Sequence, residues 1–394
     1  MYGTPGVYKD DIFPPPSVEL DTGVPVFIGI CNRQQPQANE TPVNQPQQLL
    51  WPQFEQFFGK PLANSYLAYA VRGFFQNGGR RCYVVCLNNT TSQALEEGLA
   101  ALESLNTIDL VCAPDIIGLP ALETDPEQVR IMQSAVLKHC SDLGDRFAIL
   151  DALPRAAPQA VQAQRRAFAK PYDYGALYYP WVRIADGPEQ NGAFIPACGH
   201  IAGVYARSDD RIGVHKAPAN EVLEGVLDLE ISLTNEQQGE LNRQNINCLR
   251  AFPGRGIRIW GARTLSSDPQ WLYINVRRLF LTVGRWLEVE MANTVFEPNN
   301  PSLWATIRRE LTAYFNTLFQ AGALKGNSSS DAFYIKCDEE TNPPEMREAG
   351  KVVTEIGLAP AIPGEFIVVR ILQDPSGVAI AESTRAGQSP ITKR

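Results

Sequence analysis

The sequence predicts an α/β fold, with a doubly wound, mostly parallel sheet domain, a C-terminal α+β domain, and extended N- and C-terminal arms. Short apolar segments alternate with helical patterns between residues 24 and 182, as expected for a parallel sheet covered on both faces. Two long helices with apolar stripes follow, and both ends of the chain carry extended stretches outside any periodic segment. A chain of 394 residues is long enough for two or more domains.

The sheet domain is predicted element by element. We expect strands at 24–30, 80–87, 108–114, 146–153 and 175–182, and helices at 64–77, 92–104, 126–142 and 157–168. Residues 32–48 are rich in Gln, Asn and Pro, which is typical of a surface loop. From residue 187 the pattern loosens into an expected helix at 196–207, an ordered loop at 213–221 and a polar segment at 236–247. We therefore expect a domain boundary near residue 248.

The predicted C-terminal domain begins with a β-hairpin at 249–264 and ends with strands at 333–337, 351–356 and 366–372. Two helices lie between them, because apolar residues recur with a 3.6-residue period. The residues of the two stripes are Val276, Phe280, Val283, Leu287 and Met291, then Leu303, Ile307, Leu311, Phe315 and Leu318. Asn300 before Pro301 predicts the start of the second helix, and Gly326 lies just past its end.

The two ends of the chain are predicted to be extended arms. Four prolines in residues 1–21 disfavour a helix there, and the segment that holds Val7, Tyr8 and Ile12 could pair as a strand if an edge were available. After Asp374, Val378 and Ile380 alternate with small residues, which predicts a second strand without an obvious local partner.

Composition excludes several classes of protein. Apolar residues make up 44% of the chain and charged residues 20%, which is ordinary for a globular protein. No apolar run approaches the roughly 18 residues of a membrane span, and no signal peptide is recognisable. We therefore expect synthesis in the cytosol and no direct membrane insertion. The eight cysteines are scattered, so we interpret them as reduced, buried thiols.

No motif predicts a catalytic, cofactor-binding or metal site. Gly59-Lys60 is followed by Pro61 and therefore is not a phosphate-binding loop. Gly254-Arg255-Gly256 leads into a strand, so no helix N-terminus faces a phosphate there. Cys82 and Cys86 have no compact second pair of zinc ligands, although His139 and Cys140 are conceivable partners. Asp209-Asp210 is interpreted as a pair of solvated turn charges.

Charge is distributed unevenly along the chain. The net charge is −8, yet residues 249–309 hold nine arginines against four acidic residues, a local charge of +5. On the first long helix Arg278 and Arg285 are seven residues apart, hence on one face and roughly 10 Å apart along the axis. Two interpretations remain open: these arginines pair within the chain, or they face a partner.

Several stretches of the C-terminal half resemble one known family. They are GRGIRIWGARTL, NTVFEPNNPSLW and FYIKCDEETNPPEMREAGKVVTEIGLAPAIPGEFIVVRI, and together they fall within residues 250–373. Further matching stretches are GVHKAPANE, LAYAVRGFFQNGGRRCYVV and the N-terminal TPGVY. In their order along the chain these stretches resemble the sheath proteins of contractile phage tails, R-type bacteriocins and extracellular contractile injection systems.

The resemblance implies a structural subunit with no enzymatic activity. Such a subunit would polymerise as stacked hexameric rings around an inner tube protein, meet baseplate and terminal cap proteins, and contract to drive the tube through an envelope. It implies an N-terminal arm at 1–21, an outer α/β sheath domain at 22–248, an inner C-terminal domain at 249–373 and a C-terminal arm at 374–394. Each arm would enter the sheet of a neighbouring subunit.

In such a sheath, the local charge of +5 in residues 249–309 predicts which side of the chain would face the tube. Arg278 and Arg285 are the first candidates, and Arg308 and Arg309 on the second helix are the next. Two alternatives have less support. An enzyme could reside on the doubly wound domain, with the C-terminal half serving oligomerisation. A nucleic-acid site along 249–309 conflicts with the acidic overall charge, and no recognisable module is present.

Overall fold

The computed structural model describes residues 20–31, 43–50, 53–58, 60–63, 65–117, 125–168, 173–188, 193–365, 370–374 and 377–381. The chain divides into two compact units, one up to Ala361 and one from Ile362 onward, and each is described by itself.

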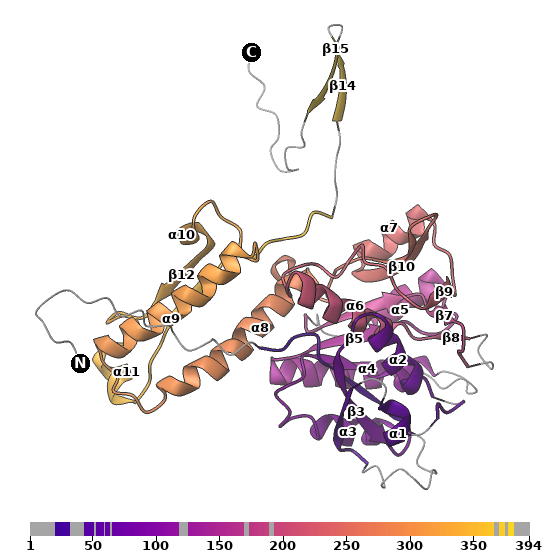
Figure 1. Ribbon diagram of the computed structural model, residues 1–394, viewed down its shortest axis with the longest axis horizontal. Helices are drawn as coiled ribbons and strands as arrows, with labels where there is room; N and C mark the ends of the chain where they lie inside the picture. Colours follow the sequence, from indigo (N-terminus) through magenta and orange to yellow (C-terminus); the bar gives the residue numbers. More distant parts are fainter. Residues whose placement is uncertain are drawn as a thin grey trace, which may run out of the picture. The chain divides into compact units, whose positions relative to one another are not determined.

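An eight-stranded sheet has the strand order β11-β10-β6-β5-β4-β1-β3-β2. It lies in the part of the first unit that holds α1 to α7 (Figure 1). The strands are β1 (Pro25–Ile30), β2 (Pro46–Leu50), β3 (Arg81–Leu87), β4 (Leu110–Cys112), β5 (Phe147–Asp151), β6 (Gly175–Tyr179), β10 (Ile246–Phe252) and β11 (Gly256–Trp260). The inner strands from β10 to β3 all pair in parallel, and the two outermost pairs are antiparallel. The predicted mostly parallel sheet is confirmed.

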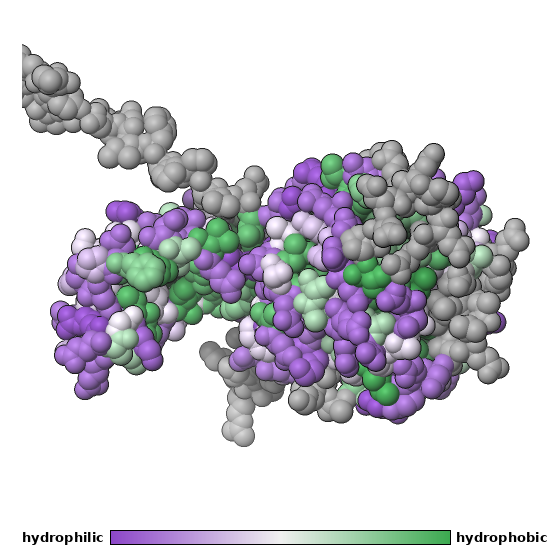
Figure 2. All heavy atoms as spheres, turned by 90° about the horizontal axis from the view of Figure 1, so that it is seen from below, coloured by the Kyte–Doolittle hydropathy of each residue, from purple (hydrophilic) through white to green (hydrophobic). Residues whose placement is uncertain are grey.

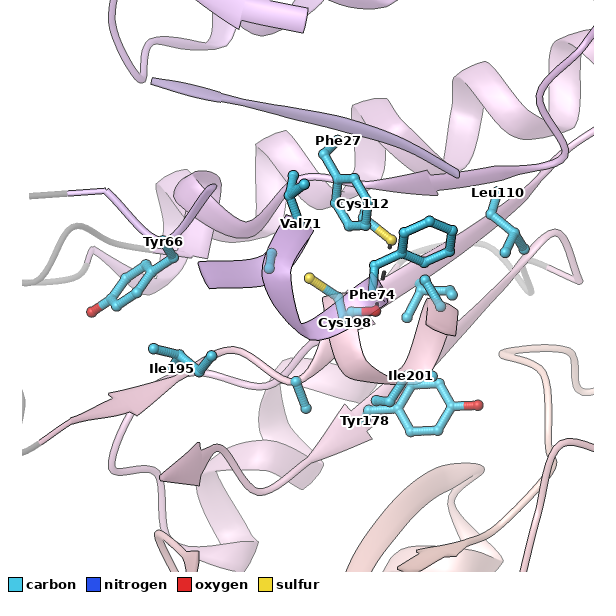
Figure 3. Close-up of a cluster of buried hydrophobic side chains, with 14 of the residues drawn as sticks. Phe27, Tyr66, Val71, Phe74, Leu110, Cys112, Tyr178, Ile195, Cys198 and Ile201 are labelled. Carbon is cyan, nitrogen blue, oxygen red and sulfur yellow. Dashed lines mark hydrogen bonds between the residues drawn. The ribbon is translucent and has the colours of Figure 1, made fainter. Parts of the chain in front are cut away.

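Helices cover both faces of this sheet, as the alternating sequence pattern predicts. One face carries α1 (Phe54–Phe58), α2 (Leu67–Gln76) and α6 (Cys198–Arg211), and the other carries α3 (Ser92–Ala100), α4 (Pro126–Leu143), α5 (Pro158–Arg166) and α7 (Asn235–Arg243). Figure 3 shows the first of these cores, where Phe27 and Leu110 of the sheet meet Phe74 of α2 and Ile201 of α6.

Smaller elements complete the first unit. A three-stranded antiparallel sheet is formed by β7 (Val182–Ile184), β8 (Phe194–Ile195) and β9 (Val226–Leu229), and short 3-10 turns lie at η1 (Pro114–Ile117), η3 (Pro269–Trp271) and η4 (Ala292–Thr294).

A third core is built from the two long helices. The elements are α8 (Ile274–Met291), α9 (Pro301–Gln320), α10 (Ser329–Ala332), α11 (Pro344–Glu348) and the antiparallel strands β12 (Phe333–Lys336) and β13 (Glu355–Leu358). Trp286 of α8 stacks on Tyr314 of α9 with ring centroids 3.7 Å apart. The Asn300 side chain accepts hydrogen bonds from the Ser302 and Leu303 N–H groups, so the predicted start of α9 is confirmed.

The second unit contains a β-hairpin of β14 (Arg370–Asp374) and β15 (Gly377–Ala381). Val378 lies opposite Gln373 and Ile380 opposite Ile371. The expectation that this strand has no local partner is therefore wrong. Val7, Tyr8 and Ile12 lie outside the described residues.

Two elements are present where the sequence pattern predicted none. Strand β2 lies partly in the predicted loop, and Leu49 is its only buried residue, so the strand carries almost no apolar signal. Helix α7 lies in the polar segment, because a capping box at Thr234 begins it and only Leu241 is buried. Strand β13 also begins later than the pattern predicted.

The expected domain boundary near 248 falls within β10. This strand pairs with β6 and β11, so the hairpin belongs to the eight-stranded sheet and not to the C-terminal domain.

The interpretation of the cysteines is partly wrong. Cys31 and Cys86 are disulfide-bonded on neighbouring strand ends, while the other six are buried free thiols.

Candidate functional site: buried charges and assembly surfaces

The carboxyl ends of the parallel strands are where an α/β enzyme would bind its ligand. Here two buried carboxylates occupy that edge. Asp151, at the end of β5, accepts hydrogen bonds from the N–H groups of Ala197 and Cys198 at the start of α6, at 2.8 and 3.0 Å. Asp115, just after β4, accepts from the Ile30 and Tyr66 N–H groups at 2.7 and 2.6 Å. Both side chains hold helices and loops in place.

Burial dominates the titration of these two groups. It raises the pKa of Asp151 to about 7 and that of Asp115 to about 6, against the lowering effect of their hydrogen bonds. Both groups are buried, so no substrate can reach them. Among the residues that the structure describes, no group of three or more His, Cys, Asp or Glu side chains could hold a metal ion. Among the residues described at this edge, the geometry therefore offers no catalytic constellation.

Arg278 of α8 is the centre of a buried ion-pair network. Its guanidinium donates to Asp209 of α6 at 2.9 and 2.5 Å and to Asp109, at the entrance to β4, at 2.9 Å. The aromatic ring of Tyr205 lies against the guanidinium, and the centroid of this ring is 4.9 Å from Cζ of Arg278. Burial lowers the Arg278 pKa and the two carboxylates raise it, with a net shift upward. The charge is therefore permanently present and internally neutralised.

This placement corrects two sequence-based predictions. Arg278 and Arg285 are only 3% and 5% exposed, so they are not available to a tube. Asp209 is not a solvated turn charge, because it lies buried within α6 and pairs with Arg278. Of the two interpretations left open, pairing within the chain is the right one for Arg278. Only the tertiary structure reveals it, since Asp109 lies 169 residues away in the sequence.

The remaining arginine candidates lie on the outside of α9. Arg308 and Arg309 are exposed. Arg308 donates one hydrogen bond to the carbonyl oxygen of Cys337 at 3.0 Å, and Arg309 lies 3.8 Å from Glu310 in an exposed ion pair. Their charges are thus directed outward, unlike those of α8.

Strands β12 and β13 form a sheet of only two strands, and in the described part of the chain no third strand joins it. One face packs on α9, where Phe333 contacts Phe315. Tyr334 of β12 is exposed. Figure 2 shows the lobe formed by α8, α9 and β12 with hydrophobic residues among hydrophilic ones. A small sheet with unpaired edges is a template for strand addition.

Two further features were candidates for a function: a membrane-spanning helix and the buried His200. Among the described helices, none is long and apolar enough to cross a membrane. His200 is buried against Gly73, and burial lowers its pKa to about 4, which indicates a neutral packing residue.

This architecture is an α/β fold with buried internal charges and, among the described residues, open edges on its small sheets. Comparison with known proteins finds two matching domains. Residues 88–265 match the phage tail sheath protein central domain, and residues 266–373 match the phage tail sheath C-terminal domain. The chain belongs to the phage tail sheath family.

Solved structures support this assignment along nearly the whole chain. The helical sheath of the anti-feeding prophage in its contracted state is 30% identical, covers 95% of this chain and all of its own, and has a TM-score of 0.75. The PVC sheath of an extracellular contractile injection system, also contracted, is 29% identical with a TM-score of 0.76, covering 95% of this chain and 99% of its own.

Several curated phage relatives are longer than this chain. The tail sheath protein of Salmonella phage ViI is 26% identical over 204 residues, which are 51% of this chain and 31% of that protein. The chain thus spans about a third of the length of this relative. These relatives are sheath proteins and not enzymes, which supports the expectation of a structural role.

Proposed function

We propose that the chain is the sheath subunit of a contractile phage tail or tail-like particle. Subunits polymerise as stacked six-fold layers around an inner tube, attach to a baseplate and a terminal cap, and contract to drive the tube through a target envelope. The observation that carries this proposal is the presence, in one chain, of a two-stranded sheet, β12–β13, and of a β-hairpin outside the main unit.

Strand exchange is the proposed link between subunits. An isolated two-stranded hairpin is marginally stable in water, and both β12–β13 and β14–β15 have unpaired edges among the described residues. Pairing the C-terminal strand of one subunit with the sheet of the next would satisfy these backbone groups. Because this contact is head-to-tail, it would generate a helical array and not a closed dimer. The N-terminal segment with Val7, Tyr8 and Ile12 is proposed to act likewise.

The inner tube is proposed to face Arg308 and Arg309 on α9. Exposed ion pairs suit a sheath that must release its tube, because each contributes about 0–1 kcal/mol and is weakened by salt.

The chain carries no nucleotide-binding motif. The work of contraction would then come from a metastable extended lattice that relaxes to a state with more contact between subunits. Assembly is proposed to take place in the cytoplasm.

Electron microscopy of the purified chain tests the proposal. We expect tubes of constant diameter from the full chain. A chain ending after Glu365 should remain folded and monomeric, because the first compact unit stays whole and the hairpin is lost. Tubes from the truncated chain would contradict strand exchange through β14–β15. A full chain that stays monomeric at every concentration, with its tube protein present, would contradict the sheath function itself.

A further inference from the structure

Residues 20–24, which lead into β1, connect two hydrophobic cores. Leu20 packs against the core of α8, α9 and β12, and Val24 belongs to the core between the sheet and α3 and α4. The three residues between them are bound by polar contacts. This segment is therefore held at the junction of the sheet domain and the long helices.

The same carboxylates that bind Arg278 also bind this segment. Asp109 accepts hydrogen bonds from the Gly23 and Val24 N–H groups at 3.0 and 2.6 Å, and the Thr22 side chain hydrogen-bonds Asp209. Gly23 has a φ of +69°, and a Cβ there would lie 2.5 Å from the Cα of Ala206. Only glycine fits this path. Arg278 thus orients both acceptors that hold residues 22–24.

A second arginine of α8 holds the preceding residue. Arg285 donates to the carbonyl oxygen of Asp21 at 3.4 Å and to that of Asn106 at 3.2 Å. Arg81 of β3 pairs with the Asp21 side chain. Arg278 and Arg285 lie seven residues apart on one helix, so α8 holds the segment at two points roughly 10 Å apart.

We propose that Arg278 and Arg285 are positioning residues that bind residues 20–24 to α8 and thereby fix where the N-terminal arm leaves the subunit. This rests on the proposed function, in which that arm binds a neighbour. While the contacts are intact, tension on the arm is transmitted directly to α8. A cavity of about 420 Å³, lined by residues 20–24 with Arg80, Arg81 and Asp210, lies beside the segment. When the arginine contacts are lost, the segment has room to take other paths.

Arg285→Met tests the clamp without disturbing the Arg278 ion pairs. Hydrogen exchange is measured on the unpolymerised fraction of the full chain, for a peptide covering residues 20–31. We expect about tenfold faster exchange at Gly23 and Val24, because a charge-assisted contact to the segment is lost. Arg130→Met is the matched control, since Arg130 pairs with Glu127 on its own helix, α4. It should leave this peptide unchanged.

Two outcomes decide the proposal. Unchanged exchange in Arg285→Met, with a cooperative thermal transition, overturns it. If that variant loses its transition, Arg285→Gln is judged by the same criterion, because its shorter, neutral side chain lacks the guanidinium that contacts both carbonyl oxygens.

Assembly is tested separately. We expect Arg285→Met to give sheaths with irregular subunit spacing by electron microscopy, and a wild-type lattice overturns the role in arm direction. Deletion of residues 1–19 tests the arm itself: normal tubes from that chain contradict this part of the proposed function, while the exchange result still decides the clamp.

Discussion

Three glycines lie where α2 and α6 cross, and two of them, Gly199 and Gly203, allow the helices to touch through their backbones. A Cβ at Gly199 would clash with the carbonyl group of Ala70, and one at Gly203 with the carbonyl oxygen of Phe74. The ring of His200 fills the space beside Gly73. Because backbone cannot move aside as a flexible side chain can, single methyl groups are costly at this crossing.

We expect Gly199→Ala and Gly203→Ala each to lower the free energy of unfolding by about 1–3 kcal/mol. Gly284→Ala is the matched control. Gly284 lies in the interior of α8, and an added Cβ there would have nothing within 4 Å, so alanine should stabilise by up to about 1 kcal/mol. Denaturant midpoints of the three variants measure these effects. Equal stabilisation at all three positions would mean that helix propensity, and not backbone contact, governs the result.

The buried Asp151 makes stability depend on pH. Its folded pKa of about 7 lies above the unfolded value near 3.9, so the native state binds more protons between these values. This group therefore contributes stability that is present at low pH and lost as pH rises toward 7. The buried His200 acts in the opposite direction, because its folded pKa of about 4 lies below its unfolded value.

Substitution isolates the Asp151 contribution. Asp151→Asn keeps an oxygen that accepts from Ala197 and Cys198 but removes the buried charge. We expect it to equal or exceed the wild type in stability at pH 8, and to lose this advantage at pH 5. Asp151→Ala should cost about 1–3 kcal/mol at both values, because two helix N–H groups lose their acceptor. If Asp151→Asn is as damaging as Asp151→Ala at pH 8, the charged carboxylate is the favoured form.

At the scale of elements, the hairpin β14–β15 is separate from the fold that it follows. The main unit ends at Ala361, where the Ala361 N–H group donates to the carbonyl oxygen of Ala323. The pairing of Ile380 with Ile371 belongs to the second unit. A substitution in β15 can change assembly without changing the stability of the subunit.

Ile380→Pro should abolish tube formation and leave the thermal transition of the subunit unchanged. Proline removes a backbone donor and disturbs strand pairing within the hairpin or with a neighbour. Ile380→Val is the control, since it keeps the donor and favours a strand. Negative-stain images and a melting curve of both variants provide the measurement. Contractile sheaths of normal appearance from the proline variant would show that β15 makes no essential pairing.

At the scale of the whole molecule, the arginines that are not paired inside the subunit show which surface is available to an acidic partner. Arg278, within the basic stretch, is neutralised inside the subunit by Asp109 and Asp209. Arg308 and Arg309 of α9 are exposed and are not neutralised by buried carboxylates in this way. A chain of net charge −8 therefore retains an exposed basic site on this helix.

Reversing Arg308 and Arg309 to Glu should leave the subunit folded but give sheaths without a tube. The proposed tube contact is electrostatic, so raising the salt concentration should weaken wild-type tube retention in the same direction. Lys138→Glu on α4, an exposed lysine paired with Asp142, is the control for a change of net charge. Co-assembly with the tube protein, followed by electron microscopy, measures tube occupancy. Filled sheaths from the double variant would exclude this face of α9.

The sequence by itself determined the parallel sheet, the two long helices and the family. Each rests on local signals: alternating apolar segments, a 3.6-residue stripe and short runs of residues in a fixed order. It also placed the arginines correctly on α8. It could not determine which way they face, because their partners Asp109 and Asp209 come from distant segments.

The tertiary structure alone decided the remaining features. Strand β2 and helix α7 each bury a single apolar residue, so their sequences have no periodic apolar pattern that would predict them. The hairpin β10–β11 joins the sheet because β10 pairs with β6, a contact between segments about 70 residues apart. Burial of a charge, or addition of a strand to an edge, depends on which distant segments meet, and that information is present only once the chain has folded.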